Sequence, residues 1–404
     1  MTTTWFDAST LPPGWQPMPI RRVGRVLNGG TPTSAPENWG GEFPFVTPPD
    51  LNGADGAVLE STGRSLSKVG TYGAGIAPPG SVLVSTRAPI GHVGRVAETS
   101  AFNQGCRAVV TQRGMEPRYL AAALVAARAE LVARGQGTTF LELSSSAFAS
   151  IPIPIPPSDE QHAISDYLDH ETAQIDALVA KQNEFIRLLR ERRAALADAE
   201  FQQAEEKHAA TIRQALVRLD RSPEPGVGVV TAYRDGVVTL RTNRRADGYT
   251  MSAAEAGYQG VVPGDIVFHA LDGFAGAVGI SDSVGQCSPV YHVCRPRYDD
   301  DAEYLALLIR YMGTSGFLST QAPSTRQRSV DFRNWGTFAR VPLHLPSPSH
   351  QKTFVTEFKR HSARVDVLIA KSEEHIALAK ERRAALITAA VTGQFDVRTA
   401  TKGA

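Results

Sequence analysis

The chain has 404 residues, which is enough for two to four structural units of ordinary domain size. Its apolar fraction of 42% is normal for a globular protein, and no apolar run reaches the roughly 20 residues that a membrane helix needs. The formal net charge is +1, which excludes a strongly basic protein that binds nucleic acid over its whole surface. Any DNA-binding charge must therefore be local or come from a partner.

The N-terminal residues and the cysteines indicate a cytoplasmic protein without a membrane segment. Residues 1–7 contain no basic stretch followed by an apolar one, so they do not predict a secretory signal. Cys106, Cys287 and Cys294 form an odd, scattered set with no CxxC pair, which argues against a disulfide framework.

The first 150 residues predict a β-rich domain with minor helices, because they are rich in Gly, Pro, Thr and Val in short apolar runs. Residues 79–84 read as a turn that enters a strand, and residues 117–134 as a helix. The alternating Ile-Pro run at 151–157 predicts an edge strand or an extended linker, because proline has no N–H to donate.

A long helix is predicted to begin at Ser158, which precedes Gln161 with the spacing of a capping box. No glycine or proline follows for several turns, and a helix up to about Ala199 would be roughly 60 Å long. Apolar residues fall on two neighbouring heptad lines, a pattern that predicts a long partner helix. These residues are Ile175, Leu189 and Leu196 on one line and Leu178 and Phe185 on the other.

Residues 211–340 predict a second β-rich domain of the same kind. Residues 263–268 again read as a turn that enters a strand, and residues 301–312 as a helix. Gly91-His92-Val93-Gly94 and Gly276-Ala277-Val278-Gly279 follow the two turns at similar distances, so the two domains look distantly related.

A repeat determines the predicted architecture, because residues 151–196 align without a gap onto residues 341–386. Glu-Arg-Arg-Ala-Ala-Leu at 191–196 recurs unchanged at 381–386, and Ser347-Pro348 provides a cap and a first-turn proline for a second helix. The simplest partner for each helix is the other, running antiparallel; alternatively, each helix packs only on its adjacent domain. The expected seam joins Ile175, Leu178, Phe185 and Leu189 to Val365, Leu368, Ile376 and Leu386.

The motifs at the domain and helix ends resemble those of specificity subunits of type I restriction-modification systems. The resemblance rests on Leu11-Pro12-Pro13-Gly14-Trp15, on the Ile-Pro run that ends at Gln161, and on residues 381–397. It implies an α+β fold with a pseudo-two-fold axis, in which two target-recognition domains alternate with two antiparallel coiled-coil helices. We expect recognition domains at 1–157 and 211–346, helical spacers at 158–210 and 347–398, and a tail at 399–404.

The resemblance also implies a function. Each recognition domain would read one half of a bipartite, asymmetric site in double-stranded DNA. The helices would recruit methyltransferase subunits, two by expectation, and a restriction or translocase subunit could join them. The subunit itself would be non-catalytic, whereas the assembled complex would be a DNA methyltransferase and an ATP-dependent endonuclease.

The residues independently suggest no catalytic, metal or cofactor site. The chain contains no Gly-Lys dipeptide and hence no P-loop. Thr47-Pro48-Pro49-Asp50 lacks the amide and the aromatic residue of an amino-methyltransferase motif, and the ten histidines are dispersed. A nucleic-acid enzyme is therefore disfavoured. A coiled-coil scaffold that binds protein without DNA specificity remains the alternative, and the salt dependence of duplex binding would separate the two.

Candidate DNA-reading residues are basic, amide and hydroxyl side chains in predicted loops, because Arg and Lys pair with guanine and Asn and Gln with adenine. In the first domain they are Arg64, Lys68, Thr86, Arg87, Asn103 and Gln104. In the second domain they are Arg241, Asn243, Arg244, Arg245, Arg326, Gln327 and Arg328. The duplicated arginines Arg192, Arg193, Arg382 and Arg383 are candidates for helix pairing and methyltransferase docking.

Overall fold

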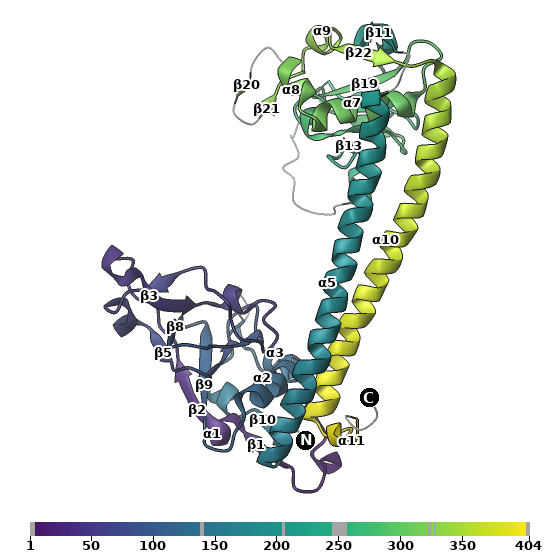
Figure 1. Ribbon diagram of the computed structural model, residues 1–404. Coiled ribbons are helices and arrows are strands. Elements are labelled where there is room, and N and C mark those ends of the chain that lie inside the picture. The colour runs from purple at the N-terminus through teal and green to yellow at the C-terminus, as the bar shows by residue number, and fades with distance from the viewer. Residues whose placement is uncertain are drawn as a thin grey trace. The chain divides into compact units, whose positions relative to one another are not determined.

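The computed structural model describes residues 5–137, 141–203, 207–244, 257–321, 325–326 and 329–400. The chain divides into two compact units, residues 1–182 with 373–404 (unit 1) and residues 183–372 (unit 2). Each unit combines a β-rich domain with parts of the same two long helices, α5 (Ser158–Gln203) and α10 (Pro348–Val391) (Figure 1). No helix in the described ranges is both long enough and apolar enough to cross a bilayer.

The domain of unit 1 contains two four-stranded sheets and a short two-stranded one. The first sheet has the order β2-β9-β6-β7, the second has the order β4-β3-β8-β5, and β1 pairs antiparallel with β10. The strands are β1 (Gln16–Pro19), β2 (Gly24–Asn28), β3 (Trp39–Val46), β4 (Ser65–Leu66), β5 (Gly75–Ala77), β6 (Val82–Ser85), β7 (Val93–Arg95), β8 (Ser100–Phe102), β9 (Cys106–Thr111) and β10 (Pro152–Ile155). The predicted strand after Pro79-Gly80 is thus confirmed as β6, and the Ile-Pro run as an edge strand.

The domain of unit 2 repeats part of this plan, with the two-stranded pairs β13–β14, β15–β18 and β20–β21 where unit 1 has its second four-stranded sheet. Its four-stranded sheet has the order β12-β19-β16-β17, which matches β2-β9-β6-β7 strand for strand, and β11 pairs with β22 as β1 does with β10. The strands are β11 (His208–Thr211), β12 (Leu216–Arg218), β13 (Val230–Ala232), β14 (Val238–Leu240), β15 (Gln259–Val261), β16 (Ile266–His269), β17 (Val278–Ile280), β18 (Gly285–Cys287), β19 (Tyr291–Pro296), β20 (Thr325–Arg326), β21 (Ser329–Val330) and β22 (Pro342–Leu345). The relationship predicted from the glycine motifs is therefore a shared topology.

The α+β prediction is confirmed, since shorter helices cover the sheets of both units. The helix predicted over 117–134 forms as α2 and α3, and that predicted over 301–312 forms as α7. The short helices are α1 (Ile20–Val23), α2 (Pro117–Ala126), α3 (Arg128–Ala133), α4 (Ser145–Ala149), α6 (Ile212–Ala215), α7 (Ala302–Thr314), α8 (Phe317–Gln321), α9 (Trp335–Phe338) and α11 (Val397–Ala400).

Helix α5 begins at Ser158 as predicted, but Gln161 does not complete a capping box. Its side-chain oxygen accepts from the backbone N–H of Glu116 (2.9 Å), and its Nε2 donates to the carbonyl of Pro156 (3.0 Å). In unit 2, Gln351 makes the same bonds with the N–H of Asp301 (2.9 Å) and the carbonyl of Pro346 (3.0 Å). The duplicated glutamine therefore fastens each long helix to its domain.

Contacts within each unit show that the two long helices run antiparallel. In unit 1, Arg383 of α10 pairs with Asp176 of α5 (3.1 Å). In unit 2, Arg193 of α5 pairs with Asp366 of α10 (2.8 Å). These are the same two repeat positions with the helices exchanged, so each ion pair joins one copy of the repeat to the other.

The buried stripe on these helices differs in part from the predicted seam. Ile175 and Leu189 are buried, and the second buried line passes through Ile186 instead of Phe185. Leu178, Phe185 and Leu368 are 48%, 42% and 42% exposed, so their placement in the seam was wrong. The seam runs along residues 175, 179, 182, 186, 189 and 193, and along 365, 369, 372, 376, 379 and 383, which are the equivalent positions.

Candidate nucleic-acid interface

The loop after β6 and the loop before β9 meet on the first domain. The N–H groups of Thr86 and Arg87 both donate to the carbonyl of Gly105, at 2.8 and 3.3 Å. This shared acceptor holds the exposed side chain of Arg87 close to the loop that carries the exposed Gln104. Two of the predicted DNA-reading residues therefore lie on adjacent, hydrogen-bonded loops.

Two other predicted residues in these loops have structural roles. Thr86 is fully buried and its hydroxyl donates to Gly105 O (3.3 Å), so it is removed from the candidate surface. Asn103 accepts the N–H of Gly105 at its Oδ1 (2.9 Å), which shapes the turn. Sequence reasoning did not separate these roles, because a polar loop residue can face either the solvent or its own backbone.

Glu142 offsets part of the positive charge that Arg87 and Arg107 bring to this surface. Arg87 pairs with Glu142 (3.2 Å), whose other oxygen lies 3.9 Å from Arg107. Burial lowers the pKa of Arg107, whereas Glu142 raises it. Arg107 also donates to Ser145 Oγ (2.8 Å), and Ser145 donates to Asn28. The sequence analysis missed this network because its members are distant in sequence.

Arg64 and Lys68 are exposed on the first domain near β4. The guanidinium carbon of Arg64 lies 3.4 Å from the ring centroid of Trp39, a cation–π contact that holds the arginine flat on the indole. Gln104 is held by the hydroxyl of Thr31. Both predicted readers are thus oriented by neighbours that the sequence analysis did not select.

The second domain presents a shorter described cluster just after β14. Arg244 pairs with Asp235 (2.6 Å). The guanidinium carbon of Arg244 lies 4.7 Å from the ring centroid of Tyr233. The hydrogen bond that Arg244 donates to Asp235 is the main cause of the raised pKa of Arg244. Asn243 donates to Thr239 Oγ1 (2.8 Å), and Arg241 is half-buried. Arg245, Gln327 and Arg328 lie outside the described residues, and Arg326 is described only as part of strand β20.

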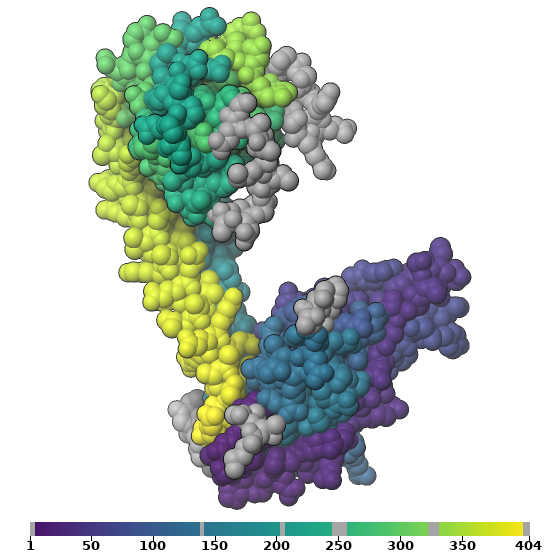
Figure 2. Space-filling view, turned by 180° about the vertical axis from the view of Figure 1, so that it is seen from behind, coloured from purple at the N-terminus to yellow at the C-terminus, as the bar shows by residue number. Residues whose placement is uncertain are grey.

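The duplicated arginines divide into two kinds. Arg193 and Arg383 form the ion pairs between the long helices, whereas Arg192 and Arg382 are exposed. Exposed leucines accompany them on the same helices, and part of α10 lies at the surface in Figure 2. Unit 1 exposes Leu178 and Leu378, and unit 2 exposes Leu188 and Leu368. Each unit therefore shows one copy of the same two repeat positions.

A family model described as the type I restriction modification DNA specificity domain matches residues 12–187. This range contains every strand from β1 to β10 and the first part of α5. Residues 12–187 are therefore similar to the type I restriction modification DNA specificity domain. The second half repeats the β2-β9-β6-β7 sheet and the β1–β10 pair of this domain within the same chain.

The chain is also similar to a curated protein and to solved structures. The specificity subunit of the type I restriction enzyme MjaIX from Methanocaldococcus jannaschii is 30% identical over 188 residues, which cover 45% of this chain and 43% of that protein. The match thus spans less than half the length of this relative. A solved chain from work on complex assembly and conformational transition of the type I R-M system matches with a TM-score of 0.66. It is 17% identical and covers 96% of this chain and 100% of its own, which shows the fold. The HsdS subunit from Thermoanaerobacter tengcongensis matches with a TM-score of 0.48 and 18% identity, covering 95% and 98% of the two chains.

Proposed function

We propose that the chain is the non-catalytic DNA-recognition subunit of a type I restriction-modification complex, in which each β-rich domain reads one half of a bipartite target. The observation that carries this proposal is the duplication of a specificity-domain topology, β2-β9-β6-β7 in unit 1 and β12-β19-β16-β17 in unit 2. Two similar domains can address two half-sites. Because their loop residues differ, the two halves of the target differ as well.

The proposal is tested by sequencing the methylome of the source strain with and without this gene. We expect one bipartite methylated motif to disappear when the gene is deleted. An unchanged methylome would favour the alternative, a protein-binding scaffold. Purified chain is expected to leave DNA unchanged in the presence of Mg²⁺, ATP and S-adenosylmethionine, and its binding to duplex DNA should weaken steeply with salt.

Arg87 is the candidate for base reading in the first domain that the described geometry supports best. It is exposed, its backbone is fixed by Gly105, and its guanidinium can pair with the major-groove edge of guanine. Arg87→Ala should weaken binding to the cognate site by about 1–3 kcal/mol, and binding to random DNA by less. Fluorescence anisotropy with both duplexes measures the difference.

Glu142→Gln is the matched control, because it releases Arg87 from its ion pair and leaves the guanidinium in place. We expect it to strengthen binding to both duplexes equally, since it removes a negative charge near the phosphates. If Arg87→Ala weakened binding to both duplexes equally, the residue would contact phosphate rather than a base.

We further propose that the two long helices pair as an antiparallel coiled coil about a pseudo-two-fold axis, and that each unit docks one methyltransferase subunit. The exchanged ion pairs and the equivalent buried stripes support the pairing. The exposed leucines support the docking, because apolar side chains repeated on a solvated helix face are typical of a binding surface. The same two repeat positions in each unit suit two identical partners. A restriction or translocase subunit would join the complex by binding to the methyltransferase subunits.

Charge introduced into one leucine patch should remove one partner. Leu178→Glu with Leu378→Glu alters unit 1, and Leu188→Glu with Leu368→Glu alters unit 2. Each double variant should bind one methyltransferase subunit where the unaltered chain binds two, and the fourfold variant should bind none. Native mass spectrometry counts the subunits directly.

Val284→Glu provides the control, because Val284 is a comparably exposed apolar residue in the loop between β17 and β18 of the second domain. It should leave both partners bound. Retention of two methyltransferase subunits by the fourfold variant would place the docking surface elsewhere.

A further inference from the structure

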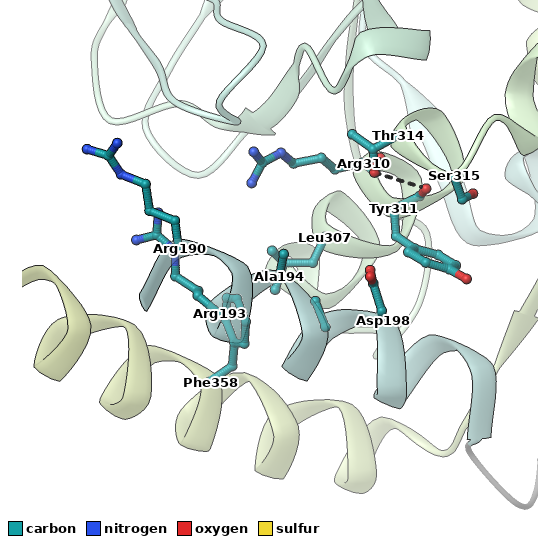
Figure 3. Close-up of a pocket in the computed structure, with 11 residues that line it drawn as sticks. Arg190, Arg193, Ala194, Asp198, Leu307, Arg310, Tyr311, Thr314, Ser315 and Phe358 are labelled. Atoms are coloured by element: carbon teal, nitrogen blue, oxygen red, sulfur yellow. Dashed lines mark hydrogen bonds between the residues drawn. The ribbon is translucent and has the colours of Figure 1, made fainter. Parts of the chain in front are cut away.

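Unit 2 contains a pocket of about 470 Å³ where α5, α7 and α10 come together. Figure 3 shows Arg310 reaching from α7 toward the end where Arg190 of α5 lies, with Asp198 and Tyr311 at the opposite end. Three arginines and one carboxylate line the pocket, so its lining is positively charged. The full lining is Arg190, Arg193, Ala194, Ala197, Asp198, Leu307, Arg310, Tyr311, Thr314, Ser315 and Phe358.

Arg310 has one hydrogen-bond donor without an acceptor. Its Nε is buried and has no hydrogen-bond partner in the described part of the chain. The side chain packs under the turn at Gly236, where a Cβ would lie 3.1 Å from the guanidinium carbon. Burial lowers the pKa of Arg310; Asp235 opposes this effect and Arg193 adds to it. A buried donor without an acceptor is costly, and the negative charge of an anion beside the guanidinium would offset part of this cost.

The equivalent place in unit 1 is occupied by a carboxylate of the chain itself. Arg383, the repeat partner of Arg193, contacts both Asp176 (3.1 Å) and Asp55 (3.6 Å). Asp55-Gly56 and Asp235-Gly236 are equivalent turns, because both glycines have a φ of +88° and the parallel bridges Val58–Arg95 and Val238–Ser281 follow them.

In unit 2, however, the second carboxylate is directed elsewhere. Asp235 pairs with Arg244 (2.6 Å), and the carboxylate paired with Arg193 is that of Asp366. Alignment of Tyr119 with Tyr304 places Val125 of unit 1 at the position of Arg310. Helix α7 of unit 2 therefore carries an arginine where α2 of unit 1 carries a valine. Unit 2 therefore has one more arginine at this place, and Asp235 pairs with Arg244 instead of with Arg193.

We propose that this pocket binds the phosphate group of a nucleotide-sized anion. Arginine forks match phosphate oxygens well, and buried charge-assisted hydrogen bonds are strong. The other walls, with Leu307, Phe358 and the ring of Tyr311, offer an apolar surface for the organic part of the ligand. The volume lies in the range of small-molecule sites. This site goes beyond the proposed function, since it involves neither base reading nor the leucine patches.

Isothermal titration calorimetry of the full chain with ATP, AMP, inorganic phosphate and adenosine tests the proposal. We expect ATP to bind and adenosine not to bind. Ala194→Glu places a carboxylate on the exposed helix face that lines the pocket, and it should lower the affinity for ATP at least about tenfold. Arg310→Gln should lower the affinity for ATP to a similar extent. Ala384→Glu is the matched control at the equivalent position of α10 and should leave ATP binding unchanged.

A short duplex of random sequence distinguishes the two sources of phosphate. If the duplex displaces ATP and loses affinity in Arg310→Gln, the phosphate that enters the pocket is that of the DNA backbone. Absence of binding by every anion, or equal weakening by Ala194→Glu and Ala384→Glu, overturns the proposal. ATP titration needs no target site and no methyltransferase. Its result therefore neither supports nor contradicts the proposed function, which the methylome experiment tests separately.

Discussion

Exchange of residues 1–157 for the corresponding segment of a related specificity subunit is expected to change one half of the methylated sequence and leave the other half intact. The segment carries the whole first domain, including both strands of the β1–β10 pair, so the exchange leaves no strand without its partner. Unit 2 keeps its sheets and its own core. Methylome sequencing of the chimera reads both halves of the target in one experiment.

The reciprocal exchange of residues 208–346 is the control, because β11 and β22 form the matching pair in unit 2. It should change only the other half of the sequence. A junction at residue 150 would instead separate β1 from β10 and should lower the thermal stability of the chimera. Chimeras in which both halves changed, or neither, would contradict a separate reader in each domain.

Asp265→Ala is expected to destabilise unit 2 by about 2–3 kcal/mol. The carboxylate is fully buried and accepts from Arg221 (2.7 Å), Arg295 (2.7 Å) and the N–H of Val262 (2.9 Å). Loss of a buried partner typically costs about 3–5 kcal/mol. Both arginine side chains are partly exposed, at 34% and 48%, so water offsets part of that cost. Urea unfolding followed by tryptophan fluorescence measures the change.

Arg295→Ala is the natural comparison, because it removes the more exposed of the two cations and leaves Asp265 bonded to Arg221 and Val262. It should cost no more than about 1 kcal/mol. Ser81 occupies the position equivalent to Asp265 in unit 1, where its hydroxyl donates to Pro78 O (2.6 Å). If Asp265→Ala cost no more than Arg295→Ala, the buried carboxylate would not organise this corner of the domain.

The architecture was predictable because prolines and sequence repeats can be recognised from short stretches of the chain. Proline in the Ile-Pro run at 151–157 indicated an edge strand or an extended linker, and the gapless repeat indicated two equivalent helices. The heptad seam was only half predictable, since Phe185 and Ile186 are adjacent and both apolar. The structure buries Ile186 because it continues the line from residue 182, whereas Phe185 lies beside that line.

The candidate interface was less predictable because it depends on which loop side chains bond to their own backbone. Thr86 and Arg87 are neighbours with similar prospects in sequence, yet one is buried against Gly105 and the other is exposed. Arg193 likewise resembles Arg192, but only Arg193 faces the partner helix. Such choices follow from tertiary contacts between distant segments, such as those of Asp366 or Glu142.

The attachment by Gln161 and Gln351 bears on how such a protein diversifies. Each amide accepts from a main-chain N–H and donates to a main-chain carbonyl, groups that almost any amino acid supplies. Gln351 also donates to the carboxylate of Asp300 (2.7 Å). Apart from Asp300, the domain side of the joint can therefore accumulate substitutions without a compensating change in the helix. A lineage that gains a new half-site specificity by recombination inherits a working joint at once, so selection can act on the recognition loops alone.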